Sequence, residues 1–222
     1  MKYPKINTLW KRDEKNKFNI IEGDYSCPEF EVIKQWHVTE KIDGTNIRIF
    51  YNPEDEVPII FGGRTDNAQT PTFLLQYLQK TFKEEMFKSV FDGAKKVILF
   101  GEGYGAKIQN GGLYRDDAGF ILFDVWLDGW WFKQEDVKFT AEKLGISSVP
   151  VIGTKMTQTE IIAYVKNQPK SLCANKEREI EGVVVRSNPL MLFRDGKPMM
   201  WKLKVKDYIK LEQGGKRASS QP

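Results

Sequence analysis

The stretch Trp36–Tyr51, WHVTEKIDGTNIRIFY, indicates the fold class because it holds two strand patterns on either side of a turn signal. Apolar and polar residues alternate before and after Asp43-Gly44, and this period of two is typical of half-buried β-strands. Asp-Gly is a common turn pair because both residues tolerate positive φ. The stretch therefore predicts a β-hairpin with Lys41 next to its bend.

Further strands follow along the chain, several of them next to Asp-Gly pairs. They are predicted at 57–64 (VPIIFGGR), 96–105 (KVILFGEGYG), 119–132 (folded at Asp128-Gly129), 179–186 (EIEGVVVR) and 191–206 (bent at Asp195-Gly196). Helices are predicted at 72–91, at 134–145 and at 157–168, where Thr157 and Glu160 form a capping-box pattern. Hairpin connections outnumber helical crossovers, so we expect an α+β fold of antiparallel sheets with helices packed outside.

Length and composition predict one domain, residues 1–210, followed by a flexible tail at 211–222. The 222-residue chain is 41% hydrophobic and has a net charge of +4, which is compatible with a local basic surface. Cys27, Cys173 and the single histidine, His37, do not form a zinc-binding pattern. Because the sequence has neither a signal peptide nor a membrane-spanning run, we expect a cytoplasmic protein in a reducing compartment with no membrane role.

Charged residues inside the predicted strands are the candidates for chemistry. Lys202 and Lys204 are two residues apart in a strand, so they share one face and favour an anion there. Lysine becomes a nucleophile as a free amine, and nearby cations would favour that form of Lys41. Glycine follows both Glu102 and Glu181, which predicts room for a ligand against the backbone. GxxxxGK[ST] and GxGxxG patterns are absent from the sequence.

Six short motifs, in order, resemble those of the covalent nucleotidyltransferases, the superfamily of DNA ligases, RNA ligases and mRNA capping enzymes. They are EKIDGTN at Lys41, GGRTDNA at Arg64, FGEGYG at Glu102, FILFDVW at Phe123, EGVVVR at Glu181, and WKLKVK at Lys202 and Lys204. A single KxDG would be weak evidence, whereas the ordered set covers nearly the whole chain. Asn46 stands where DNA ligases and capping enzymes usually have arginine, so the chain is most similar to the RNA ligase 2-like group.

The resemblance implies an adenylyltransferase domain, in which a nucleotide cleft lies between antiparallel sheets. It also implies the cofactors ATP and Mg²⁺ or Mn²⁺, and the joining of 3′-OH and 5′-phosphate RNA ends through lysyl-AMP and RNA-adenylate. Lys41 is then the nucleophile, and Lys202 and Lys204 bind the α-phosphate. Glu181 binds the metal through water.

The resemblance also implies the residues that bind the nucleoside. Phe123 stacks on adenine, with Trp126 as the alternative stacking residue. Glu102 accepts a hydrogen bond from the ribose, and Arg64 with Asn46 binds phosphate or ribose groups. Glu40 and Ile42, on either side of Lys41, meet the adenine edge partly through their backbone.

The implied partner is RNA, as a nicked duplex or as bridged ends, bound by a monomer of the compact kind that viruses of bacteria carry. The N-terminal stretch 4–18, with Arg48, Lys107 and Arg115, is the candidate for a basic path to the nucleic acid. The alternatives are a minimal DNA ligase, a capping guanylyltransferase that forms lysyl-GMP, and a degenerate RNA-binding module that retains the pocket without activity.

Overall fold

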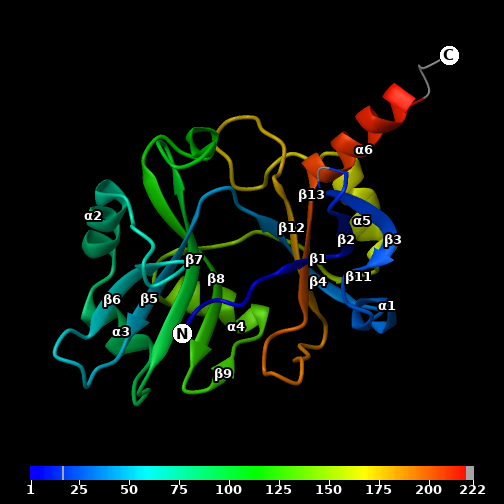
Figure 1. The fold of residues 1–222 in the computed structure, drawn as a ribbon. Helices are drawn as coiled ribbons and strands as arrows, with labels where there is room; N and C mark the ends of the chain where they lie inside the picture. The colour runs from blue at the N-terminus through cyan, green and yellow to red at the C-terminus, as the bar shows by residue number, and fades with distance from the viewer. Residues whose placement is uncertain (17, 219–222) are drawn as a thin grey trace. The chain divides into compact units, whose positions relative to one another are not determined.

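The computed structural model of the chain describes residues 1–16 and 18–218, and Figure 1 traces its helices and strands. Its contacts group into two compact units. The first unit comprises Met1–Tyr3, Ile42–Val149 and Cys173–Arg178, and the second comprises Pro4–Lys41, Pro150–Leu172 and Glu179–Pro222. The chain passes from the second unit to the first between Lys41 and Ile42, inside the stretch that opened the sequence analysis.

The second unit is built on a five-stranded sheet of order β1-β13-β12-β4-β11. Its strands are β1 (Asn7–Thr8), β4 (Trp36–Lys41), β11 (Val151–Met156), β12 (Gly182–Ser187) and β13 (Met200–Lys204). All pairs are antiparallel except β1 with β13. β2 (Trp10–Asp13) and β3 (Asn19–Tyr25) form a separate hairpin, and the helices are α1 (Glu29–Val32), α5 (Gln158–Lys166) and α6 (Val205–Ala218).

One face of this sheet forms the core of the second unit. Val38, Val183, Val185, Trp201 and Leu203 alternate along their strands and pack with buried side chains of α1, α5 and α6. The alternation leaves the intervening residues of β4 and β13 on the other face of the sheet.

The first unit is built on a sheet of order β10-β8-β7-β5-β6, with β9 paired to β8. Its strands are β5 (Thr45–Tyr51), β6 (Ile59–Gly63), β7 (Val97–Gly105), β8 (Ala118–Leu127), β9 (Trp130–Trp131) and β10 (Ser147–Ser148). The helices are α2 (Thr72–Thr81), α3 (Glu84–Val90) and α4 (Gln134–Lys143), with the short 3-10 helix η1 (Gly111–Leu113). Ile47, Ile49, Leu99, Leu122 and Val125 face α2, α3 and α4 in the larger core cluster.

The hairpin predicted across Asp43-Gly44 is wrong. β4 pairs with β11 and β12, whereas β5 pairs with β6 and β7 in the other sheet. An alternating pattern identifies the faces of a strand but not its partner. A Cβ at Gly44 would lie 2.3 Å from the carbonyl oxygen of Gly103, so glycine is needed there for a close approach of two backbone segments.

The single helix predicted over 72–91 is two helices, α2 and α3. The chain is extended at Phe82, and the side chain of Phe82 is buried in the core between them. Glu84 and Glu85 occupy the first turn of α3, where acidic side chains stabilise the positive end of the helix dipole. The apolar repeat of four residues therefore continues across a break in the helix.

The remaining element predictions are largely confirmed. The turn at Asp128-Gly129 joins β8 to β9, α4 ends before Gly145, and the Thr157–Glu160 capping box opens α5. In the strand predicted at 191–206, the residues before Asp195-Gly196 form only an isolated β-bridge, between Leu192 and Pro198. Mostly antiparallel sheets with helices packed on them confirm the α+β class.

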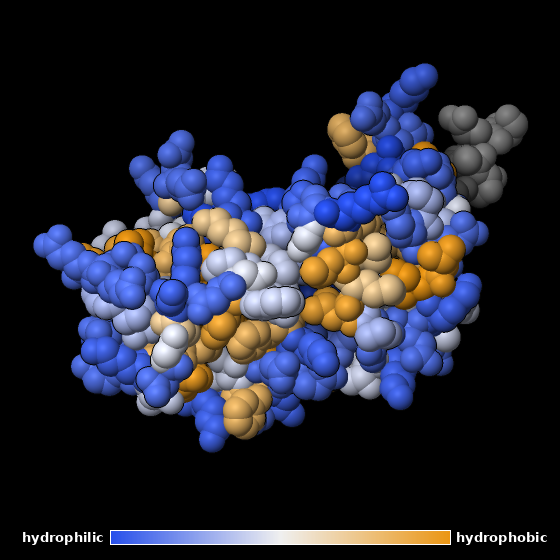
Figure 2. Space-filling model, turned by 90° about the horizontal axis from the view of Figure 1, so that it is seen from below, coloured by the Kyte–Doolittle hydropathy of each residue, from blue (hydrophilic) through white to orange (hydrophobic). Residues whose placement is uncertain are grey.

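The predicted tail is partly helical, because α6 continues to Ala218, and residues 219–222 lie outside the described residues. The flexible tail and the single domain over 1–210 remain predictions. Figure 2 shows orange apolar side chains in several patches on a largely hydrophilic face. Val32, Trp130 and Leu172 are among the exposed apolar residues.

Candidate active site

Three adjacent strands of the second unit bring the predicted catalytic lysines into one row. β12 lies between β4 and β13, and its Gly182 is paired with Lys41 on one side and with Lys204 on the other. Partners across neighbouring strands share a face of the sheet, so both lysines extend from the face opposite the core. Glu181 immediately precedes Gly182, just before β12 begins, and its carboxylate lies beside both lysines.

The carboxylate of Glu181 is shared by the two lysines. Lys41 Nζ lies 2.6 Å from Glu181 Oε2, and Lys204 Nζ lies 2.6 Å from Glu181 Oε1. The lysine side chains are each 21% exposed and the glutamate side chain 14%, so the cluster is mostly shielded from solvent. The structure thus brings together three residues that are 140 and 23 positions apart in the sequence.

Two opposing effects determine the charge state of Glu181. Burial raises the pKa of this carboxyl group, but the ammonium groups of Lys41 and Lys204 lower it, and the net pKa is below its ordinary value. The carboxylate is therefore ionised at neutral pH. It holds both lysines by charge-assisted hydrogen bonds.

Lys202 shares this face, as predicted. It is paired with Val184 of β12, two positions along β13 from Lys204. Its side chain is partly exposed, and it lines a groove together with Lys204. The prediction that Lys202 and Lys204 point the same way is confirmed.

Glu40 faces the opposite side of β4 from Lys41. Its side chain is 1% exposed, and its carboxylate accepts hydrogen bonds from the Ser171 hydroxyl at 2.5 Å and the Leu172 amide at 2.8 Å. In the structure this side chain therefore ties β4 to the segment before Cys173. Its predicted contact with adenine remains a prediction.

A second set of predicted residues lies in the first unit, on the sheet face that points away from the larger core cluster. Asn46 of β5 is paired with Glu102 of β7, which is paired with Ile121 of β8. Phe123 follows on β8, where the register shifts between the Phe100–Asp124 and Gly101–Leu122 pairs. This β-bulge turns Phe123 and Asp124 to the same face, between two core residues.

The surroundings of these residues differ. Asn46 Oδ1 is buried and has no hydrogen-bond partner among the described residues, which is costly unless a ligand supplies one. Phe123 is partly exposed and packs against a small cluster that contains buried Ile42 and Ile121. Arg64 is exposed directly after β6.

The glycines after Glu102 and Glu181 make room for protein, which corrects the expected space for a ligand. A Cβ at Gly103 would lie 2.6 Å from a Leu74 methyl group of α2, and one at Gly182 would lie 2.0 Å from the carbonyl oxygen of Leu203. Small residues are needed here so that helix and strand backbones can approach.

A family model of RNA ligases matches residues 34–204, which are 171 of the 222 residues of the chain. The chain belongs to the RNA ligase family. No curated protein matches the sequence. Within the described residues, no helix has the length and apolarity needed to cross a membrane.

Solved structures of Naegleria gruberi RNA ligase have a similar fold. A variant without ligand has a TM-score of 0.66 at 18% identity, covering 95% of this chain and 57% of that one. A variant with ATP and manganese has a TM-score of 0.66 at 18% identity, covering 95% and 58%. The form with pyrophosphate has a TM-score of 0.64 at 20% identity, covering 96% and 58%. The chain therefore spans less than two thirds of the ligase chains it resembles.

The sequence did not reveal the contacts that surround Asp43, two residues after Lys41. The Tyr114 hydroxyl accepts a hydrogen bond from the Asp43 amide at 3.1 Å, and Arg178 approaches the Asp43 carboxylate at 3.9 Å. The Arg178 guanidinium also lies 4.0 Å from the centre of the Tyr114 ring. Tyr114 and Arg178 are distant from Asp43 in the sequence, and no local pattern around them indicates that they contact it.

The described residues contain no group of three or more His, Cys, Asp or Glu side chains that could bind a metal ion by themselves. Mg²⁺ usually keeps several waters and binds through one or two carboxylates and the phosphates of a substrate. A lone acidic side chain such as Glu181 fits a site of that kind.

Proposed function

We propose that the protein is an ATP-dependent RNA ligase that joins 3′-OH and 5′-phosphate RNA ends through lysyl-AMP and RNA-adenylate. The observation that carries this proposal is the pair of lysines that share the carboxylate of Glu181. Family membership supports the choice of Lys41 as nucleophile, because EKIDGTN lies inside the matched residues 34–204.

In the first step Lys41 gives up one proton of its ammonium group, and the resulting amine attacks the α-phosphorus of ATP. A P–N bond forms, the bond between the α- and β-phosphates breaks, pyrophosphate leaves, and the amine loses a proton. Negative charge on the phosphoryl oxygens is stabilised by Lys202 and Lys204, whose positions on one sheet face suit an anion. The hydrogen bond to Glu181 fixes the orientation of the Lys41 side chain before the reaction.

In the second step a 5′-phosphate of RNA attacks the phosphorus of lysyl-AMP. A phosphoanhydride bond forms, the P–N bond breaks, and Lys41 regains its protons. In the third step a 3′-hydroxyl attacks the activated 5′-phosphate and loses its proton. A phosphodiester bond forms, the phosphoanhydride bond breaks, and AMP leaves. Both steps use the same lysines for charge stabilisation.

Residues of the first unit are proposed to bind the nucleoside. Phe123 stacks on adenine, Glu102 accepts from the ribose, and Asn46 with Arg64 binds ribose or phosphate groups. Asn46 Oδ1, which has no hydrogen-bond partner in the described part of the chain, and the bulge that turns Phe123 off the core face support this assignment. Glu40 and Ile42 are proposed to contribute through their backbone.

Mg²⁺ or Mn²⁺ is the proposed metal, and Glu181 would hold it through water. When bound, such an ion supplies charge neutralisation at the phosphates. The complex of Naegleria gruberi RNA ligase with ATP and manganese supports this choice by similarity of fold.

We further propose that residues 1–210 form one adenylyltransferase domain with a nucleotide cleft, and that the protein acts as a monomer in the cytoplasm on nicked duplex or bridged RNA. Within the described residues neither Cys27 nor Cys173 forms a disulfide, which supports a reducing compartment. That viruses of bacteria encode it remains a proposal.

The proposal is tested by incubating the protein with labelled ATP or GTP and divalent metal, and then adding nicked RNA or DNA on one template. We expect an adduct with ATP and sealing of the RNA nick. An adduct with GTP alone identifies a capping enzyme, and sealing of DNA alone identifies a DNA ligase. RNA binding without any adduct, unchanged in Lys41→Ala, identifies a non-catalytic module.

A further inference from the structure

A groove of about 650 Å³ lies wholly within the second unit and continues from the catalytic lysines. Its walls are the N-terminal segment from Lys5 to Arg12, the end of β13, and the first turns of α6. Lys204 belongs both to this groove and to the ion pair with Glu181. The groove therefore begins at the residue that shares a carboxylate with Lys41.

The groove concentrates positive charge. Its lining includes seven cationic side chains and two carboxylates, an excess of five positive charges, whereas the whole chain has a net charge of +4. The cations are Lys5, Lys11, Arg12, Lys202, Lys204, Lys206 and Lys210. The rest of the protein is therefore close to neutral, and the basic character lies in this groove.

Protein carboxylates neutralise only part of this charge. Arg12 forms a two-point contact with buried Asp207, at 2.8 and 3.2 Å, and Lys11 pairs with Asp24 at 2.7 Å. No carboxylate of the described residues forms an ion pair with Lys5, Lys206 or Lys210, and all three side chains are exposed. These three lysines are available to an external anion.

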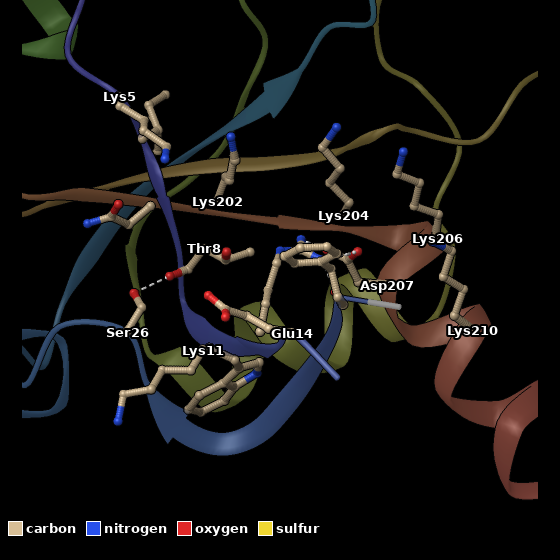
Figure 3. Close-up of a pocket in the computed structure, with 15 residues that line it drawn as sticks. Lys5, Thr8, Lys11, Glu14, Ser26, Lys202, Lys204, Lys206, Asp207 and Lys210 are labelled. Carbon is tan, nitrogen blue, oxygen red and sulfur yellow. Dashed lines mark hydrogen bonds and ion pairs between the residues drawn. The ribbon is translucent and has the colours of Figure 1, made fainter. Parts of the chain in front are cut away.

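The lysines are arranged for a ligand more than for helix stability. Figure 3 shows Lys202, Lys204 and Lys206 in a row along β13 and its continuation into α6, with their side chains extending to the same side. Lys206 is in the first turn of α6, where a cation opposes the helix dipole, and Lys210 follows four residues later as a like charge on the same side of the helix. Both placements cost stability, which an anionic ligand would offset.

An aromatic side chain favours a nucleic acid strand over a small anion. Phe18, in the β2–β3 turn, lines the groove and is 59% exposed. Single-stranded nucleic acids are bound by cations that follow the backbone and by aromatic rings on which bases stack. Neither pyrophosphate nor an inorganic triphosphate carries a base that could stack on the Phe18 ring.

We propose that this groove binds the phosphodiester backbone of the RNA substrate, with Lys5, Lys206 and Lys210 as phosphate contacts beyond the reacting end. The choice of RNA rests on the proposed function, whereas the binding of a polyanionic strand rests on the charge and shape of the groove. Two lysines of α6, Lys206 and Lys210, thus join the N-terminal stretch 4–18 in the proposed basic path. Arg48, which the sequence grouped with that stretch, is instead buried and bonded to Gly63 and Asp66.

The test compares the triple variant Lys5→Ala, Lys206→Ala, Lys210→Ala with the wild type and with a control triple variant. The control, Lys133→Ala, Lys138→Ala, Lys143→Ala, removes three exposed lysines at or next to α4 in the first unit, which is the same change in charge. Binding of labelled 5′-phosphorylated RNA is measured by fluorescence anisotropy in EDTA without ATP, across a range of salt concentrations. Lysyl-AMP formation is measured separately.

We expect the groove variant to bind RNA roughly tenfold or more weakly, and its slope of log K against log salt to fall by about 2 to 3, while the control variant keeps both. Lysyl-AMP formation should be equal in all three proteins. Unchanged RNA affinity and slope in the groove variant would overturn the proposal. Unchanged RNA affinity with a raised KM for ATP would identify the groove as a site for the triphosphate instead. RNA binding is measured without ATP, so it does not depend on lysyl-AMP formation. Failure of the wild type to form lysyl-AMP would refute the proposed function but not the proposed RNA binding by the groove.

Discussion

At the residue scale, one carboxylate between two ammonium groups defines the candidate site. Glu181 is ionised because Lys41 and Lys204 offset the cost of its burial. The arrangement leaves one net positive charge among the three groups, which favours the approach of a polyphosphate. Each lysine nevertheless has a different predicted role, so single substitutions should separate them.

Replacing Lys204 with alanine should slow lysyl-AMP formation by about 10²- to 10³-fold, the usual effect of removing one preorganised donor at a developing oxyanion. Lys41 would keep its ion pair with Glu181, so the fold should be intact. Single-turnover adduct formation measures the rate, with exposed Lys206→Ala as the matched control. A rate for Lys204→Ala within twofold of the wild type would remove this residue from the site.

The lowered pKa of Glu181 predicts a dependence of stability on pH. The folded protein binds this proton less tightly than the unfolded chain, whose carboxyl group titrates near about 4.3. The ion pairs therefore stabilise the fold above that pH, and their contribution is lost as pH falls through the lowered folded value.

Denaturant unfolding of the wild type and of Glu181→Gln from pH 7 to pH 3 tests this dependence. We expect the wild type to be more stable at pH 7 and the difference in unfolding free energy to shrink on acidification, because protonated glutamate resembles glutamine. A difference that stays constant down to pH 3 would argue against the ion pairs as its source.

The convergence of Lys41, Glu181 and Lys204 was predictable from ordered motifs. The position of the Glu40 carboxylate was not, because its partners Ser171 and Leu172 are more than 130 positions away and lie in no motif. A single sequence reports which face of a strand a residue occupies, but it does not report what packs on that face.

At the element scale, the register of β12 with β4 and β13 places the lysines in one row, and Gly182 permits that register. A Cβ there would lie 2.0 Å from the carbonyl oxygen of Leu203, a backbone atom that cannot rotate away. The close packing of β12 against β13 therefore requires glycine directly after Glu181.

Gly182→Ala should lower the unfolding free energy by about 1 to 3 kcal/mol, as overpacking does, and should also reduce lysyl-AMP formation because the row is displaced. The control is Gly112→Ala, where an added Cβ meets no atom within 4 Å. Denaturant unfolding and adduct formation are measured on both variants. A Gly182→Ala protein with the stability and adduct rate of the wild type would contradict the register argument.

The cap of α5 gives a stability prediction with no expected effect on chemistry. The Thr157 hydroxyl accepts from the Glu160 amide at 3.3 Å, and the Glu160 carboxylate accepts from the Thr157 amide at 2.7 Å. Thr157→Ala should therefore cost about 1 kcal/mol of unfolding free energy while lysyl-AMP formation stays unchanged. An unchanged unfolding midpoint would mean that the capping box contributes no net stability.

Most strands and helices were predictable from periodicity and turn residues, whereas their partners were not. The alternation around Asp43-Gly44 identified β4 and β5 but suggested that they pair, although they belong to different sheets. The apolar repeat over 72–91 likewise could not show that the chain leaves the helix at Phe82, because a buried residue continues the pattern in either conformation.

At the scale of the whole molecule, the sequence alternates between two units, since each contains segments from distant parts of the chain. The prediction of a single domain over 1–210 requires that the units fold cooperatively. Calorimetry should then show one unfolding transition whose calorimetric and van't Hoff enthalpies agree. Two separate transitions would show that the units are independent domains.

Family membership could be predicted from the order of short motifs, which extends from Glu40 to Lys204, and the α+β class from the strand patterns and turn residues. The basic groove could be predicted only in part: the sequence indicated the N-terminal stretch 4–18 but not the lysines of α6. Those lysines become neighbours of the N-terminal segment through the pairing of β1 with β13. That pairing joins residues nearly 200 positions apart and leaves no local trace in the sequence.

The central claim is that Lys41 becomes covalently linked to AMP, and peptide mapping by mass spectrometry after incubation with ATP and Mg²⁺ tests it most directly. We predict one AMP on the peptide that contains Lys41, its loss on addition of pyrophosphate, and its absence in Lys41→Ala. AMP on a different residue, or an adduct that persists in Lys41→Ala, would contradict the account.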